Sequence, residues 1–294
     1  MKIAVNTRLL LKDKLEGIGW VAYECLKRIV TNHPDDDFYF IFDREPDEKF
    51  IFAENVKPVV LFPQARHPFL YIAYFEFSVA RFLRKLKPDL YLSTDAYLSL
   101  RSKTKQLAVF HDLNFEHFPQ DFPKIHLWHY KKFFPKYAKK ADRIITVSEF
   151  SKQDICKNYG IDPSKIDVVY NGANADFCPV DDNVKIEIRS KFSQGKPYFM
   201  FVGSLHPRKN LARLFTAFDI FKLNDKRYAL VVKNGIIDSE TRNKYLKELK
   251  EILDKSSKLH KIQYKITLIG SNEILGDKKK YVTFSKYLES KLFK

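Results

Sequence analysis

Residues 197–210 read PYFMFVGSLHPRKN, and this stretch predicts a strand, a tight loop and a helix. The apolar run 197–202 is followed by Gly203, which lets the backbone turn without a Cβ clash. Apolar residues then recur at helical spacing from Leu211 onward, and Pro207 suits the first turn of that helix, where its missing N–H costs nothing. The loop between strand and helix is therefore the first place to look for chemistry.

Two adjacent cations, Arg208 and Lys209, stand in this loop. Free backbone N–H groups and the positive end of a helix dipole would lie beside them. Two neighbouring negative charges, as in a diphosphate, suit such a site because both cations pair with phosphate oxygens. The alternative interpretation is a solvated basic pair on the shoulder of a helix.

The chain has 294 residues, enough for two domains, and 45% of them are hydrophobic, as in globular proteins. Its formal net charge of +16 indicates an anionic partner, namely nucleic acid, lipid headgroups or phosphorylated small molecules, unless a Lys-favouring codon bias alone raises the count. The positive residues are scattered and no recognition motif accompanies them, so we expect no nucleic-acid partner.

The cellular compartment can be predicted from three features. The three cysteines lie far apart, which argues for a reducing compartment and against a disulfide framework. The first residues run straight into a strand pattern instead of a signal peptide, and no apolar stretch reaches the roughly 18–20 residues of a membrane span. We therefore expect a cytoplasmic protein, with peripheral contact to the inner membrane as an open alternative.

Short apolar runs alternate with helical patterns, which predicts an α/β fold with a parallel sheet covered on both faces. Polar residues from 173 to 196 suggest a domain boundary, so we divide the chain into domains 1–172 and 173–294. Seven strand candidates fall in the first domain and three in the second. The ten candidates are 2–6, 38–42, 58–62, 89–93, 106–110, 143–147 and 166–170, then 197–202, 228–232 and 262–269.

Ligands of such sheets bind at the carboxyl ends of the strands. This rule points to Asn6–Arg8, Ser93–Asp95, His111–Asp112 and Ser148–Glu149. His111 directly follows an apolar strand, where it can bind a ligand hydroxyl or carbonyl. Alternatively a backbone carbonyl fixes His111 while Asp112 caps the next turn.

Three further patterns each have two interpretations. Gly17 and Gly19 open a helix, and they either cap it or let a phosphate or sugar approach the backbone. Ser148 is a good N-cap for the next helix, which alone would explain it. Residues 69–87 form an aromatic helix with a basic end, typical of a membrane-surface helix but favoured here as a core helix.

Residues 124–140 predict another helix, interrupted near Pro135. His126 and His129 lie three residues apart in it, a spacing that a zinc site could use. No Cys or carboxylate cluster accompanies them, so we do not favour a metal there.

Five short motifs in order carry a resemblance to a known family. They are Gly17-Ile18-Gly19, Val109-Phe110-His111-Asp112, Thr146-Val147-Ser148-Glu149-Phe150-Ser151, Val168-Val169-Tyr170-Asn171-Gly172 and Phe201-Val202-Gly203-Ser204 with Arg208-Lys209-Asn210. This order resembles family 4 glycosyltransferases, retaining enzymes of GT-B fold often described as mannosyltransferase-like. The resemblance covers residues 1 to about 233 and extends more faintly to Gly270.

The resemblance implies two Rossmann-like domains facing across a cleft. A nucleotide-diphosphate sugar would bind mainly to the second domain, and a glycan or lipid-linked acceptor to the first, in the assembly of a polysaccharide. By this analogy three residues are catalytic: His111, Arg208 and Lys209. Donor or phosphate binding would involve Gly17, Gly19, Gly203, Ser204, Arg208 and Lys209, and the cleft lining would include Asp112, Ser148 and Asn171. No cofactor or metal is implied, because cationic side chains would neutralise the leaving group.

One family motif has no good counterpart here. The family carries two glutamates eight residues apart in a glycine-containing context, whereas Glu240 and Glu248 lie in a Lys-rich helical stretch without glycines. We read these two as a solvated helix face. The expectation is a glycosyltransferase whose second domain is incomplete, and the alternative is an inactive remnant, or half of a split transferase, that acts as a binding protein.

Overall fold

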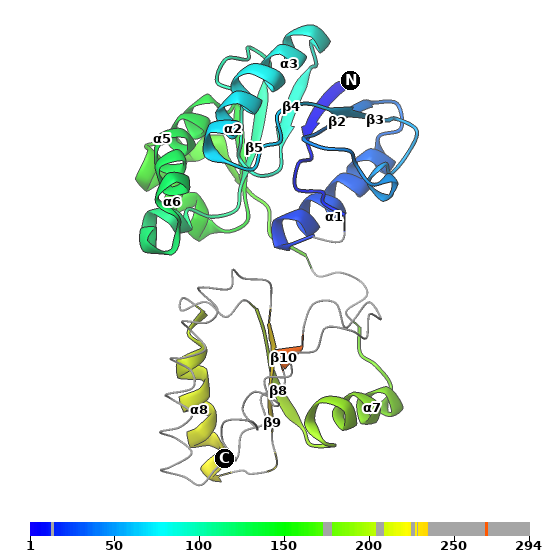
Figure 1. The fold of residues 1–294 in the computed structure, drawn as a ribbon, viewed down its shortest axis with the longest axis vertical. Coiled ribbons are helices and arrows are strands. Elements are labelled where there is room, and N and C mark those ends of the chain that lie inside the picture. Colours follow the sequence, from blue (N-terminus) through cyan, green and yellow to red (C-terminus); the bar gives the residue numbers. More distant parts are fainter. Residues whose placement is uncertain are drawn as a thin grey trace. The chain divides into compact units, whose positions relative to one another are not determined.

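The computed structural model describes residues 1–12, 15–172, 178–203, 209–224, 227, 229–234 and 268–269. The chain divides into two compact units, Met1–Asn174 and Ala175–Lys294 (Figure 1). The sequence pattern places its boundary between residues 172 and 173.

The first unit is built on a parallel sheet that contains all seven strands expected from the sequence (Figure 1). Its strand order is β3-β2-β1-β4-β5-β6-β7. The strands are β1 Lys2–Asn6, β2 Asp37–Phe42, β3 Val56–Val60, β4 Leu90–Ser93, β5 Gln106–Phe110, β6 Arg143–Thr146 and β7 Ile166–Val168. The α/β class is therefore confirmed.

Helices lie in four of the six connections between these strands. They are α1 Gly17–Asn32, α2 Pro68–Ala73, the π-helix η2 Tyr74–Val79, α3 Ala80–Leu86, α4 Asn114–His117, α5 Lys124–Lys140 and α6 Glu149–Tyr159. Three short 3₁₀ turns lie at Glu48–Phe50, Pro119–Asp121 and Pro163–Lys165. The ends of α6 follow the expected chemistry: the Ser148 hydroxyl accepts from the Ser151 N–H, and Gly160 ends the helix at φ 64°.

Alternate side chains of each strand point to opposite faces of the sheet, and helices cover both faces. Phe38, Phe40 and Phe42 of β2 pack with Leu26 and Val30 of α1 on one face. The other face holds a larger cluster contributed by α2, η2, α3, α5 and α6, with Tyr74, Tyr91, Tyr137, Ile144 and Ile155 among its members. In Figure 1 these helices lie on the side of the sheet opposite α1.

The aromatic helical stretch of the first unit is a core element. Tyr74, Phe75 and Leu83 are fully buried, as the favoured interpretation of residues 69–87 requires. Phe69 and Phe77 of the same helical stretch are nevertheless more than half exposed, on its outer side.

The expected interruption of α5 at Pro135 is wrong. The helix continues through Pro135 without a break from Lys124 to Lys140. A proline removes one hydrogen bond, and burial of Phe133, Phe134 and Tyr137 around it holds the helix in place.

The second unit contains, within its described residues, a parallel sheet of order β10-β9-β8. Its strands are β8 Tyr198–Gly203, β9 Ala229–Asn234 and β10 Leu268–Ile269, and its helices are α7 Asp182–Ser193 and α8 Leu211–Asn224. Phe199 of β8 contacts Phe218 and Phe221 of α8, so the strand–loop–helix order predicted from residues 197–210 holds. Helix α8 begins at Leu211, and Pro207, expected in its first turn, lies outside the described residues.

Candidate active site

The order of the strands selects one position on the sheet for a ligand. From β1 the chain adds β2 and β3 to one side, and it then crosses over to add β4 to β7 on the other side. The strand order therefore reverses between β1 and β4. In open parallel sheets, ligands bind at the carboxyl ends of the strands at such a reversal.

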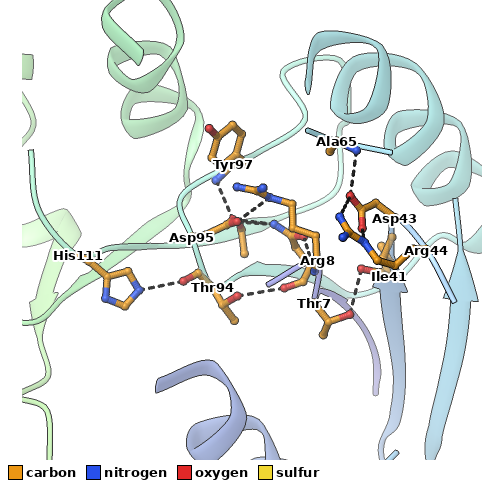
Figure 2. A network of polar contacts seen from close by, with 12 residues as sticks. Thr7, Arg8, Ile41, Asp43, Arg44, Ala65, Thr94, Asp95, Tyr97 and His111 are labelled. Atoms are coloured by element: carbon orange, nitrogen blue, oxygen red, sulfur yellow. Dashed lines mark hydrogen bonds and ion pairs between the residues drawn. The ribbon is translucent and has the colours of Figure 1, made fainter. Parts of the chain in front are cut away.

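A buried polar network occupies this position (Figure 2). Asn6, the last residue of β1, donates from Nδ2 to Asp95 Oδ1 at 2.7 Å and to Ser93 Oγ at 3.3 Å. Arg8 Nε lies 2.8 Å from Asp95 Oδ2 and forms an ion pair with it. The two strand ends are thus joined by side chains that carry one positive and one negative charge.

Aromatic rings surround the Arg8 guanidinium. Its Cζ lies 4.4 Å from the Tyr97 ring centroid and 5.4 Å from that of Tyr71, within the range of cation–π contacts. Burial disfavours the charge and is the largest single influence, but the Asp95 carboxylate and the surrounding tyrosines together outweigh it, so the pKa of Arg8 is raised and the ion pair persists.

His111 is joined to the same network through Thr94 (Figure 2). Its Nε2 lies 3.0 Å from the Thr94 carbonyl oxygen, and the Thr94 hydroxyl donates to the Asn6 carbonyl at 3.1 Å. A carbonyl only accepts, so Nε2 carries the hydrogen and Nδ1 of the neutral ring is an acceptor. His111 is half-buried, and within the described residues no hydrogen bond engages Nδ1.

The structure confirms the alternative interpretation of His111-Asp112 and does not test ligand binding by His111. A backbone carbonyl does fix His111, and Asp112 Oδ1 accepts from the Asn114 N–H at 3.0 Å as a turn cap. This arrangement holds the imidazole in one orientation and leaves Nδ1 for a hydroxyl donor.

The two glycines at the start of α1 differ in their surroundings. A Cβ on Gly19 would lie 3.0 Å from the Leu9 carbonyl oxygen and 3.2 Å from Leu15 Cδ2, so close packing requires this glycine. A Cβ on Gly17 would meet no atom of the described part of the chain within 4 Å. Protein packing therefore explains Gly19 and leaves the exposed Gly17 available for another purpose.

Ser148 and Asn171 were both expected to line the cleft, and they lie in different surroundings. Ser148 caps α6, and its partner Ser151 donates from Oγ to the His111 carbonyl at 3.3 Å. The capping interpretation of Ser148 is therefore correct, and the cap also connects α6 to the His111 backbone. Asn171 is exposed and follows β7.

The expected diphosphate residues belong to the second unit. Gly203 ends β8, and Lys209 is exposed two residues before α8 begins. Asn210, with φ 54°, connects Lys209 to that helix. Ser204 and Arg208 lie outside the described residues, as do Glu240 and Glu248.

Sequence reasoning located the carboxyl edge but missed two of its ion pairs. It pointed to Arg8 and Asp95 by position and gave neither a role. It did not identify Asp43, which follows β2, is buried, pairs with Arg44 through both oxygens and accepts from the Ala65 N–H at 2.9 Å. The same strand-end rule, applied to β2, would have found it.

His126 and His129 do not form a metal site in the described part of the chain, where no group of three metal-ligating side chains occurs. His129 is fully buried against aromatic rings, and its ring is stacked on Phe133 at 4.6 Å. The expectation that no metal is needed is not tested by this finding.

The fold resembles that of solved glycosyltransferase structures. Anabaena Alr3699/HepE in complex with UDP and glucose matches with a TM-score of 0.60 at 16% identity, over 92% of this chain and 69% of that one. WaaG, a glycosyltransferase involved in lipopolysaccharide biosynthesis, matches with a TM-score of 0.61 at 11% identity, over 92% and 71%. The fold class is that of the GT-B glycosyltransferases.

Sequence comparison then assigns the family. The model of Glycosyltransferase Family 4 matches residues 17–177, more than half of the chain. The O-antigen chain mannosyltransferase B of Escherichia coli is 24% identical over 248 residues, 79% of this chain and 64% of that protein. O-antigen chain mannosyltransferase RfbU of Salmonella typhimurium is 25% identical over 162 residues, 54% and 40%. The chain belongs to glycosyltransferase family 4 and spans less than two thirds of the length of these two relatives.

Proposed function

We propose that this protein transfers a sugar from a nucleotide-diphosphate sugar to a glycan or lipid-linked acceptor. The observation that carries the proposal is the network at the reversal between β1 and β4, which fixes His111 with Nδ1 unengaged. Family membership supports the reaction class, and the names of the two mannosyltransferase relatives support mannose as the sugar.

The proposed reaction proceeds with retention at the anomeric carbon. The bond from that carbon to the diphosphate oxygen breaks, and a new bond forms to an acceptor hydroxyl oxygen. The hydroxyl proton leaves with the diphosphate. Arg208 and Lys209 would neutralise the developing charge of this leaving group, because fixed cations stabilise a transition state in which charge accumulates.

His111 would orient the donor sugar. Because Nε2–H is held by the Thr94 carbonyl, Nδ1 can accept a hydrogen bond from a sugar hydroxyl without a change of tautomer. Because the His111 ring is already held in place, less conformational entropy is lost when the sugar binds to it.

Gly17 would allow the donor to approach the backbone at the start of α1. No atom of the described residues lies within 4 Å of the position that a Cβ would take, and the first N–H groups of a helix attract anions. Asp112, Ser148 and Asn171 are proposed as more distant lining residues at the same sheet edge.

The test is release of nucleoside diphosphate from a panel that includes GDP-mannose and UDP-glucose, with an O-antigen oligosaccharide as acceptor. We expect release with one donor, and a decrease of at least about 100-fold in His111→Ala. His33→Ala, which changes an exposed histidine at the end of α1, is the matched control and should retain activity.

Two results would contradict the proposal. Equal activity of the His111 and His33 variants would remove His111 from the site. Absence of release with every donor, from a folded sample that also fails to bind nucleotide, would favour a binding protein without transferase activity.

A further inference from the structure

An exposed apolar surface lies on the helices that cover the larger core cluster. We call it the aromatic face, and it consists of Phe62, Phe69, Leu70, Phe77 and Trp128. Phe69 of α2 and Trp128 of α5 are 59% and 39% exposed, and their ring centroids lie 6.0 Å apart. The Ser78 hydroxyl donates to the Phe62 carbonyl, which places the Phe62 loop beside Phe77 on η2. Exposed patches of this kind mark interaction surfaces.

The helices that carry this face are rich in basic residues. Three of them lie on α3, namely Arg81, Arg84 and Lys85. Six lie on α5, namely Lys124, Lys131, Lys132, Lys136, Lys139 and Lys140. The one acidic residue of these elements, Glu76, is buried and accepts from the Leu100 and Arg101 N–H groups.

Two cations lie directly over rings of the aromatic face. Lys132 Nζ is 4.8 Å from the centroid of the Trp128 ring, and Arg101 Cζ is 4.3 Å from that of Phe77. Apolar rings bordered by long basic side chains can enter a lipid interface while the charged ends stay at the headgroups.

We propose that the aromatic face docks this protein on the surface of a bilayer that contains anionic lipids. Clustered Lys and Arg residues are attracted to negative headgroups, and Trp and Phe side chains gain from burial below them. A second copy of this chain fits less well, because it would bring one basic surface against another. No helix in the described residues is long and apolar enough to span a membrane, so the contact proposed is peripheral.

The aromatic face is continuous with the network at β1 and β4. Successive ring contacts run from Phe69 to His67 at 5.4 Å, to His126 at 6.5 Å, to Tyr71 at 6.1 Å and to Arg8 at 5.4 Å. A lipid-linked acceptor in that bilayer would therefore lie close to the candidate active site. This last step depends on the proposed function, whereas lipid binding itself does not.

The chain offers a specific readout because it contains only two tryptophans, Trp20 and Trp128. Trp20 is 50% exposed on α1, on the other face of the sheet, and is the matched control. We would mix the full chain with vesicles of phosphatidylglycerol and phosphatidylcholine, or of phosphatidylcholine alone. In Trp20→Phe, which reports on Trp128, emission should shift to the blue with anionic vesicles. In Trp128→Phe, which reports on Trp20, it should not shift.

Sedimentation with the same vesicles gives the affinity. We expect Phe69→Ala/Trp128→Ala to weaken binding at least tenfold, and Lys132→Glu/Lys136→Glu to weaken it as much at low salt. Trp20→Ala and Lys27→Glu, both on α1, should bind as the unchanged chain does. Circular dichroism would verify that each variant is folded.

Several outcomes would overturn the proposal. These are no binding of the unchanged chain to anionic vesicles, equal binding to both vesicle types, or equal losses in the α1 controls and in the aromatic-face variants. Self-association that the Phe69/Trp128 variant abolishes, without vesicle binding, would instead assign the face to a second copy. Loss of lipid binding with normal transfer to a soluble acceptor would leave the proposed function intact.

Discussion

The ion pair between Arg8 and Asp95 illustrates how burial changes the cost of losing one partner. Their side chains are 12% and 4% exposed, whereas those of Arg143 and Asp167 are each 50% exposed. Removal of one partner from a buried pair leaves an uncompensated charge, which water cannot solvate. An exposed pair loses little because solvent replaces it.

We predict that Asp95→Asn destabilises the first unit by about 3–5 kcal/mol. Asp167→Asn, the matched exposed variant, should leave the unfolding midpoint almost unchanged. Urea unfolding at neutral pH measures both. Similar midpoints for the two variants would show that the network at the sheet edge is not held by the buried pair.

The two glycines of α1 give a second prediction at this scale. Gly19→Ala places a methyl group 3.0 Å from the Leu9 carbonyl oxygen and should destabilise the protein by about 1–3 kcal/mol. The methyl group of Gly17→Ala meets no described atom within 4 Å, so the variant should change stability by no more than about 0.5 kcal/mol.

If Gly17 admits a donor, Gly17→Ala should instead reduce transfer. Thermal unfolding and the diphosphate-release assay on both variants separate packing from binding. A Gly17→Ala protein of normal stability and normal activity would remove this glycine from the proposed site.

Helix α5 is the element in which sequence and structure differ most instructively. The apolar periodicity of residues 124–140 was sufficient to predict the helix, and Pro135 wrongly suggested a break. Propensity acts locally, whereas the burial of Tyr137 and Ala138 against the sheet is a tertiary effect that no local rule contains.

His129 on α5 makes the stability of the protein depend on pH. Burial among aromatic rings lowers the pKa of His129 to about 4, below its value of about 6.5 in an unfolded chain. Between pH 6.5 and about pH 4, His129 is therefore protonated in the unfolded chain but neutral in the folded chain. Stability is complete above pH 6.5 and falls by about 3 kcal/mol as the pH decreases to 4.

His129→Phe should remove this contribution while keeping an aromatic ring against Phe133. Unfolding free energies at pH 7, 5.5 and 4.5 would show a shallower decrease in the variant. His33→Ala, an exposed histidine, serves as the control. Parallel pH curves for His129→Phe and the unchanged chain would rule out a neutral buried histidine as the source.

At the scale of the whole molecule, the sequence predicts the alternation of strands and helices well. All seven strands of the first unit follow from apolar runs and their spacing, and with them the set of strand ends at which a ligand can bind. The spatial pairing of Arg8 with Asp95, 87 residues apart in the chain, does not follow, because it depends on β1 and β4 becoming neighbours. The role of Thr94 in fixing His111 is hidden for the same reason.

The proposed reaction requires both units of the chain. Each contributes a different part: the first holds His111 and the aromatic face, and the second holds the cations after β8. The proposed donor diphosphate site in the second unit is the feature on which the proposed transfer depends.

Calorimetric titration of the full chain with GDP and UDP tests that site most directly. The account predicts that one nucleotide binds and that Arg208→Ala/Lys209→Ala weakens binding by at least about tenfold, or about 1.4 kcal/mol. Lys196→Ala, which removes an exposed cation just before β8, should bind normally. No binding of either nucleotide to the folded chain, or equal affinity in all three proteins, would contradict the account.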